Sequence, residues 1–278
     1  MSTTLPSTPF STLIAQRQQR GADVIFDIPD DWLQGRTSFG GLVSALSVQA
    51  MRDVAGGAWP EGVTLRALQV NFIAPVGAGP LAVQVQVLRE GRSIRQVQAL
   101  ARHGGESAAL LVGVFGSDRP TSLAPLRPMR PPPRHAVDEL PTIPFVPGTR
   151  PNFLLHFDTR WADGERPFSG GTSWHASIHM RLADDDAATL PPELVTVLMA
   201  DVSPTPALGH FSQPVPASSV SWALEMRPLP PGEAIAGWWR ADNEALAADG
   251  GYVNQRSTLW APGGRLAALA YQVVTVYG

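Results

Sequence analysis

One carboxylate stands alone at the end of an apolar run in the second half of this 278-residue chain. Asp201 directly follows the residues Leu-Val-Thr-Val-Leu-Met-Ala, and Pro204 comes three positions later. A helix that covers this run must therefore end close to Asp201, where the helix macrodipole disfavours an anion. The carboxylate also borders the hydrophobic core, so it needs a polar partner there. Such a group can act as a general base on water, although it could also simply hydrogen-bond the frayed helix end.

An amide and two hydroxyls could cooperate with this carboxylate. Gln272 interrupts the apolar strand that closes the chain, and Ser218 and Ser219 begin an earlier alternating strand. Strict alternation places Val220 and Trp222 on one face of that strand and Ser219 on the other. A hydroxyl and an amide near an acid can orient a water molecule. The structural alternatives are a serine at a strand edge and a glutamine on a solvated face.

The elements that would carry these residues occur twice along the chain. Each half has an apolar helix, predicted over about 39–54 and 192–201, followed by about four strands joined by tight turns. In the first half we expect four strands: one that ends near residue 72, one that starts at 81, one through 96–101 and one over 108–115. In the second half we expect one strand that ends near 226, one around 235–240, one over 252–260 and one over 266–277. The repeated order indicates an internal duplication.

The spacing of matching turns supports the duplication. Matching positions differ by 153 early in each half and by 159 later, as shown by the pairs Pro75–Pro228, Gly91–Gly250 and Gly104–Gly263. One insertion of six residues reconciles the two registers. The counterpart of Gln272 in the first half is then Gly113, and the counterpart of Asp201 lies near Val48. The two halves are therefore chemically different, and only the second carries the candidate residues.

A proline-rich segment separates the halves. Residues 118–148 contain nine prolines, including three in a row, so they form neither a helix nor a central strand. We assign 1–117 to an N-terminal domain, 118–148 to a linker and 149–278 to a C-terminal domain with the candidate site. A helix as apolar as 42–51 needs burial around most of its circumference, which an antiparallel sheet wrapped around it provides. Two such α+β hotdog units can pair edge to edge, which predicts a double hotdog.

The composition argues against several classes of function. The net charge is −3, the isoelectric point is near 6.1, and no run of Lys or Arg indicates a nucleic-acid or anionic-membrane surface. Cys is absent, which excludes disulfides, Cys-ligated zinc, iron–sulfur clusters and thiol nucleophiles. No 18 consecutive apolar residues occur, so we expect no transmembrane helix and a cytoplasmic protein.

Other catalytic patterns are weaker. The sequence contains neither the Gly-x-Ser-x-Gly elbow of serine hydrolases nor a Gly-x-Gly-x-x-Gly fingerprint after a strand. His175 and His179 stand four apart in what reads as a strand, with Asp158 and Asp163 nearby. These groups could hold a metal, but they lack the spacing of a known metal motif, so we expect neither a metal nor a cofactor.

The order and local sequence of these segments resemble those of the type II (TesB-like) acyl-CoA thioesterases, which are double-hotdog proteins. The resemblance covers nearly the whole chain beyond about Asp27. It rests on the order and spacing of short segments: Gly35-Arg36, Phe39-Gly40-Gly41, Asn71-Phe72-Ile73-Ala74-Pro75, Glu90-Gly91-Arg92-Ser93, Ala200-Asp201, Arg227-Pro228 and Gly264-Arg265-Leu266-Ala267-Ala268, with Gln272 beyond.

The resemblance implies a hydrolytic site of an Asp, a Ser or Thr, and a Gln that together hold the attacking water. The Asp carries over to Asp201 and the Gln to Gln272. The hydroxyl carries over to Ser219 if one residue is deleted before Arg227, and to Ser218 if the count is rigid. Two positions depart from the family pattern and bear on substrate choice: Leu42 replaces a frequent Gln, and Ser221 replaces a usual acid.

The expected reaction is hydrolysis of an acyl-CoA thioester to the free acid and CoA. Gly40 and Gly41 open the first helix, and helix N-termini supply backbone donors for a developing oxyanion, so both are candidate substrate-binding residues. The alternatives are a hydratase or dehydratase acting on acyl-CoA and an acyl-CoA-binding protein without thioesterase activity. We expect a homodimer or a larger homo-oligomer, because a double hotdog still exposes a broad sheet face.

Overall fold

The structure, a computed structural model, describes residues 7–185 and 187–278. The first half contains two helices and eight strands: α1 (Phe10–Ala15), β1 (Gln18–Arg20), β2 (Asp23–Ile28), β3 (Leu33–Gln34), β4 (Thr37–Ser38), α2 (Gly40–Ala55), β5 (Thr64–Phe72), β6 (Gly79–Glu90), β7 (Ile94–His103) and β8 (Glu106–Gly116). The second half contains β9 (Phe157–Gly164), β10 (His175–Leu182), α3 (Pro192–Met199), β11 (Ala217–Met226), β12 (Trp239–Asp249), β13 (Tyr252–Trp260) and β14 (Leu266–Val276).

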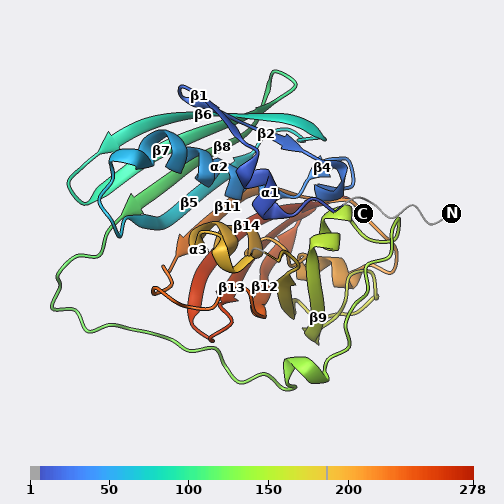
Figure 1. The fold of residues 1–278 in the computed structure, drawn as a ribbon. Coiled ribbons are helices and arrows are strands. Elements are labelled where there is room, and N and C mark those ends of the chain that lie inside the picture. Colours follow the sequence, from blue (N-terminus) through green and yellow to red (C-terminus); the bar gives the residue numbers. More distant parts are fainter. Residues whose placement is uncertain (1–6, 186) are drawn as a thin grey trace.

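A single antiparallel sheet of 12 strands runs through both halves. Its order is β1-β2-β6-β7-β8-β5-β11-β14-β13-β12-β10-β9, and β3 pairs only with β4. Figure 1 shows α2 against the strands of the first half and α3 against those of the second. Each half is thus an antiparallel sheet curved around one helix. The predicted double hotdog is confirmed, including the edge-to-edge pairing of the two units through β5 and β11.

The two halves match strand for strand and also in their irregularities. Read outward from the β5–β11 junction, the six strands on one side occur in the same chain order as the six on the other. β5 and β11 each carry one unpaired bulge residue, Arg66 and Val220. β6 and β12 do the same at Leu88 and Leu246. Bulges re-aim side chains and are retained as features, so their repetition supports the duplication.

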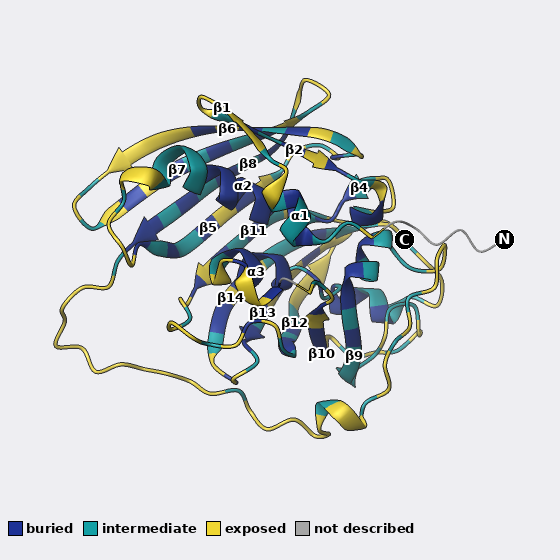
Figure 2. Cartoon of the chain, viewed as in Figure 1, coloured by how far each residue is buried: buried dark blue, intermediate teal, exposed yellow. Residues whose placement is uncertain are grey.

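Burial explains why these segments fold as they do. From Gly41 to Met51 every residue of α2 is buried, in agreement with an apolar helix enclosed by a sheet (Figure 2). The residues of α3 from Leu194 to Met199 are buried as well. The two helices also contact each other, and this contact brings the end of α3 to the beginning of α2.

A second contact between the halves is aromatic and polar. Trp32 precedes β3, and its ring stacks on the imidazole of His156, which precedes β9, with 3.9 Å between ring centroids. The Nε2 atom of His156 lies 3.2 Å from a carboxylate oxygen of Asp31, and both side chains are almost fully buried. This Asp–His pair lies in a packed junction between the halves and makes no contact with Asp201 among the described residues.

The segment between β8 and β9 follows the outside of the second half. It is largely exposed (Figure 2) and carries two short 3-10 helices, Val137–Glu139 and Asn152–His156. Several hydrogen bonds attach it to the second half, two of them near its middle. The N–H of Arg130 donates to the carbonyl of Gly264 at 2.9 Å, and the Arg240 guanidinium donates to the carbonyl of Pro131 at 3.1 Å.

Two predictions about strands were wrong. The strand expected around 235–240 is β12, which begins only at Trp239, because Pro230 to Glu233 form a turn with Gly232 at φ 79°. Each half also has strands before its helix that were not predicted, namely β1, β2, β3 and β4 in the first half and β9 in the second. None of the described helices is long and apolar enough to cross a membrane.

Candidate active site

Asp201 lies two residues past the last residue of α3 and points at the beginning of α2. Its position just beyond a helix end agrees with the prediction from Pro204. The backbone N–H of Gly41, in the first turn of α2, donates to the Asp201 carboxylate. The carboxylate therefore faces the C-terminus of its own helix and the N-terminus of the other, whose free N–H groups and dipole favour an anion.

The two glycines that open α2 are required by this close approach. A Cβ atom on Gly40 would lie 2.9 Å from Oδ2 of Asp201 and 3.0 Å from the ring of Phe72. A Cβ atom on Gly41 would lie 2.5 Å from the ring of Phe39 and 3.0 Å from the carbonyl oxygen of Leu198. The sequence assigned the carboxylate, hydroxyl and amide to the second half and offered Gly40 and Gly41 of the first helix as substrate-binding residues. In the structure both glycines lie beside Asp201, so the first helix borders the candidate site.

Gln272 and Ser219 complete a connected polar group. The side-chain Nε2 of Gln272 donates to Oδ1 of Asp201 at 3.1 Å and to Oγ of Ser219 at 2.6 Å. Gln272 lies opposite Trp222 across the β11–β14 pair, on the face of the sheet that carries the core. The alternative of a glutamine on the solvated face is therefore wrong.

A bulge in β11 turns Ser219 toward this group. Val220 has no partner on β14, because Ser219 pairs with Val274 and Ser221 with Val273. Without the bulge, Ser219 and Trp222 would point to opposite faces, which is what strict alternation predicted. The extra residue brings them onto the same face and leaves Val220 38% exposed. The predicted alternation is thus wrong at this end of the strand.

Ser218 lies outside the group. Its residue is exposed, and its backbone carbonyl accepts a hydrogen bond from the Thr275 hydroxyl at 3.0 Å. Of the two candidate hydroxyls, only that of Ser219 contacts Gln272 in the structure.

Burial raises the pKa of Asp201 from its ordinary 3.8 to about 6, and the hydrogen bonds from Gln272 and from the Gly41 backbone oppose that rise. The Asp201 residue as a whole is still partly exposed, so the carboxylate is withdrawn from bulk water without being sealed off. A carboxylate with this pKa is largely ionised at neutral pH and basic enough to accept a proton from water.

One nearby residue was missed by the sequence argument. Gln255 lies directly opposite Gln272 across the β13–β14 pair, and its Nε2 donates to Oε1 of Gln272 at 2.8 Å. Gln255 is 5% exposed. A buried glutamine in a strand is a signal that could have been noticed, but its partner depends on the strand register, which the sequence does not provide.

The histidine–carboxylate cluster considered from the sequence does not assemble. His175 lies 3.5 Å from Asp163, whereas Asp158 pairs with Arg181 instead. Within residues 7–185 and 187–278, no three His, Asp or Glu side chains gather as a metal-binding group.

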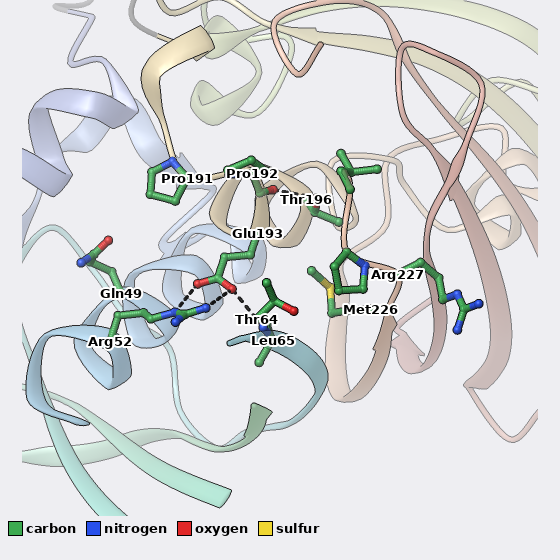
Figure 3. A pocket seen from close by; sticks show the side chains of 12 residues that line it. Gln49, Arg52, Thr64, Leu65, Pro191, Pro192, Glu193, Thr196, Met226 and Arg227 are labelled. Carbon is green, nitrogen blue, oxygen red and sulfur yellow. Dashed lines mark hydrogen bonds and ion pairs between the residues drawn. The ribbon is translucent and has the colours of Figure 1, made fainter. Parts of the chain in front are cut away.

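A larger pocket lies at the opposite pair of helix ends and is the counterpart of this site. It measures about 360 Å³ and is lined by residues of both halves (Figure 3). Four of its lining residues match the site by helix start or bulge position: Gln49 for Asp201, Leu65 for Ser219, Pro192 for Gly40 and Glu193 for Gly41. Gln49 and Leu65 lack the carboxylate of Asp201 and the hydroxyl of Ser219, and Pro192 has no N–H to match that of Gly40.

An ion pair occupies part of the counterpart pocket. The Glu193 carboxylate accepts two hydrogen bonds from the Arg52 guanidinium, at 2.5 and 2.6 Å, and one from the N–H of Leu65 at 3.0 Å (Figure 3). Bidentate pairs of this kind fix the geometry of both side chains. The candidate site thus holds the group of Asp201, Gln272 and Ser219, whereas the counterpart pocket holds an ion pair.

Family models match both halves of the chain. Residues 28–116 match the acyl-CoA thioesterase N-terminal domain, and residues 137–276 match the acyl-CoA thioesterase C-terminal domain. The chain belongs to the acyl-CoA thioesterase family. It is a TesB-like double hotdog and a thioester hydrolase, and the resemblance found in the sequence is confirmed. No curated protein matches the chain by sequence.

Solved structures of similar fold span the whole length of this thioesterase. A hot dog fold protein of unknown function from Alicyclobacillus acidocaldarius is 22% identical with a TM-score of 0.76, covering 97% of this chain and 98% of that one. The tesB protein of Mycobacterium avium subs paratuberculosis is 15% identical with a TM-score of 0.76, covering 97% and 98%. The acyl-CoA thioesterase II TesB2 of Mycobacterium marinum is 17% identical with a TM-score of 0.69, covering 95% of each chain. At these identities the likeness concerns the fold.

Proposed function

We propose that this thioesterase hydrolyses acyl-CoA to the free acid and CoA with a water molecule activated by Asp201. One observation carries the proposal. A buried carboxylate with a pKa raised to about 6 shares the Gln272 amide with the hydroxyl of Ser219, at the N-terminus of a helix. Such an arrangement combines a base, two groups that orient water and backbone donors for negative charge.

Asp201 takes a proton from water as the water oxygen attacks the thioester carbonyl carbon. The resulting tetrahedral oxyanion collapses, the carbon–sulfur bond breaks, and the CoA sulfur leaves with the proton that Asp201 holds. Gln272 uses its two N–H groups on Asp201 and Ser219, so the Ser219 hydroxyl can donate its own hydrogen to the attacking water.

The oxyanion is assigned to the first turn of α2. The N–H groups of Leu42 and Val43 donate to the carbonyl of Phe39, and that of Gly41 donates to Asp201. The N–H of Gly40 precedes all of these and has no acceptor within its own helix. We assign this donor to the developing oxyanion, where a single well-placed donor is worth about 10²–10³ in turnover.

Three further properties are proposed with the reaction. We place the enzyme in the cytoplasm, in fatty acid metabolism, and we expect a homodimer formed through the outer face of the sheet. Large apolar side chains are exposed on or beside that face in the second half: Val220, Leu246, Tyr252, Leu269 and Tyr271. Apolar patches of this kind mark association surfaces. Light scattering at micromolar concentration should give twice the mass of one chain, and a monomer would contradict the dimer.

Release of free CoA from a panel of acyl-CoAs tests the proposed function. A thiol reagent detects each CoA released, and formation of the free acid is followed in parallel. Equal amounts of acid and CoA are expected from at least one acyl chain. Binding without release would indicate an acyl-CoA-binding protein, and conversion of an enoyl-CoA to the 3-hydroxyacyl-CoA would indicate a hydratase.

A further inference from the structure

Gln255 lies behind the proposed catalytic group and contacts it only through Gln272. Its Nε2 donates to Oε1 of Gln272 at 2.8 Å, and the two residues face each other across the β13–β14 pair. Gln255 is 5% exposed and lines a small polar cavity with Ser203, Asn243 and Ser257. No step of the proposed reaction uses it.

The orientation of the Gln272 amide decides whether the site can work. Its NH₂ end must face Asp201 and Ser219, because an ionised carboxylate only accepts hydrogen bonds. If the amide rotated by half a turn, its carbonyl oxygen would lie against the Asp201 carboxylate. That arrangement places two acceptors together, and it leaves the NH₂ end facing Gln255.

Gln255 opposes this rotation. It presents an N–H donor to the carbonyl end of Gln272, while its own Oε1 has no hydrogen-bond partner among the described residues. With both amides in these orientations, Asp201, Ser219 and the Gln272 carbonyl are satisfied together. In a buried network, a carbonyl without a donor is destabilising because it has lost its hydrogen bonds to water. The two amides of Gln255 and Gln272 thus form a row of hydrogen bonds that ends at the Asp201 carboxylate.

We propose that Gln255 is a positioning residue for the thioesterase reaction, which acts by holding the Gln272 amide with its NH₂ end toward Asp201 and Ser219. The inference rests on the proposed function of Asp201 and Gln272. It extends the site from three side chains to four.

Substitutions at position 255 test the role against matched controls. Gln255→Met keeps the length of the side chain and removes the donor, so kcat should fall about tenfold with KM little changed. In a Gln272→Ala background the same substitution should cost nothing further, because the group it positions is gone. Asn254→Asp, at the exposed neighbouring position on β13, should leave kcat unchanged.

Gln255→Glu gives a readout that a merely structural residue would not produce. While the introduced carboxyl is protonated it can donate to Gln272, and once ionised it can only accept, which favours the rotated amide. Its kcat should therefore approach that of the wild type at low pH and fall as pH rises, whereas Asn254→Asp follows the wild-type profile. Thermal unfolding of each variant verifies that it is folded.

An NMR titration of the Asp201 carboxyl separates this inference from the proposed function. The hydrogen bond from Gln272 lowers the pKa of Asp201, so Gln255→Met should raise that pKa further. An unchanged pKa, or an equal loss of kcat in the wild-type and Gln272→Ala backgrounds, would overturn the positioning role. Absence of CoA release from the wild type would instead overturn the proposed reaction, and the titration would still decide the role of Gln255.

Discussion

At the scale of single residues, the pKa of Asp201 results from effects that oppose each other. Burial and the end of α3 act against its ionisation, while the Gln272 amide and the Gly41 N–H act for it, and the result is a pKa of about 6. A carboxyl at the ordinary 3.8 would be a much weaker base, and one raised far higher would be neutral at pH 7. The intermediate value suits a base that must be ionised before it accepts a proton.

This pKa makes Asp201 a cost to stability, with a sign that can be tested. When the pKa of a carboxyl is higher in the folded state than in the unfolded state, its ionisation opposes folding, and the full effect is reached once pH exceeds the folded-state pKa. As pH rises from 4 to 7, ionisation of Asp201 therefore lowers the free energy of unfolding by at most about 3 kcal/mol. Asp201→Asn should raise the free energy of unfolding at pH 8 and leave it unchanged near pH 4. Urea unfolding at both pH values measures this, and an Asn variant less stable at pH 8 would contradict it.

The two neighbouring serines provide a matched comparison. Ser219→Ala removes the hydroxyl that contacts Gln272 and should lower kcat/KM by about 10- to 100-fold. Ser218→Ala changes an exposed side chain one position away and should leave kcat/KM within about twofold. Rates of CoA release from one acyl-CoA measure both. A larger loss in the Ser218 variant would contradict this assignment and indicate that Ser218, and not Ser219, supplies the hydroxyl.

At the scale of elements, the site depends on where α2 begins and where α3 ends. Gly41 allows them to approach, because its missing Cβ leaves room for the Phe39 ring and the Leu198 carbonyl. Gly41→Ala should separate the two helices and cost about 1–3 kcal/mol of stability together with most of the activity. Gly57→Ala is the control, since a Cβ there meets nothing within 4 Å. Thermal unfolding and CoA release should change in the first variant only.

Local sequence patterns predicted the elements more fully than their orientation. The apolar periodicity located α2 and α3 within a few residues, and the repeated turns indicated the duplication. The side on which Ser219 points did not follow, because the bulge at Val220 arises from pairing with β14 and leaves no mark in the alternation. Gln255 was missed for the same reason, since strand register is a long-range property.

At the scale of the whole molecule, duplication created two related sites, and Asp201, Ser219 and Gln272, predicted from the sequence, lie together at one of them. How α2 and α3 meet there follows from the β5–β11 junction and from how the helices cross, which the sequence does not provide. The register it used nevertheless matches the structure: Gly113 pairs with Leu68 as Gln272 pairs with Trp222, at corresponding places relative to the two bulges. The other site retains a pocket but none of the reactive groups.

The counterpart pocket should matter for stability and not for turnover. Glu193→Ala would leave the Arg52 guanidinium and the Leu65 N–H without their acceptor in a partly buried place. We expect a loss of about 1–3 kcal/mol in the free energy of unfolding, with kcat/KM per folded chain unchanged. Urea unfolding and CoA release distinguish the two effects. A drop in kcat/KM at full folding would give this pocket a part in the reaction.

The pH dependence of kcat/KM in the wild type and in Asp201→Asn tests the central claim most directly. If Asp201 is the general base, the wild-type value should rise with pH and level off above an apparent pKa of about 6. Asp201→Asn should fall by about 10²–10⁴ and lose this dependence, whereas Asp27→Asn, on the exposed side of β2, should keep it. An Asp201→Asn enzyme that keeps wild-type turnover and the same pH profile would remove the carboxylate from the mechanism.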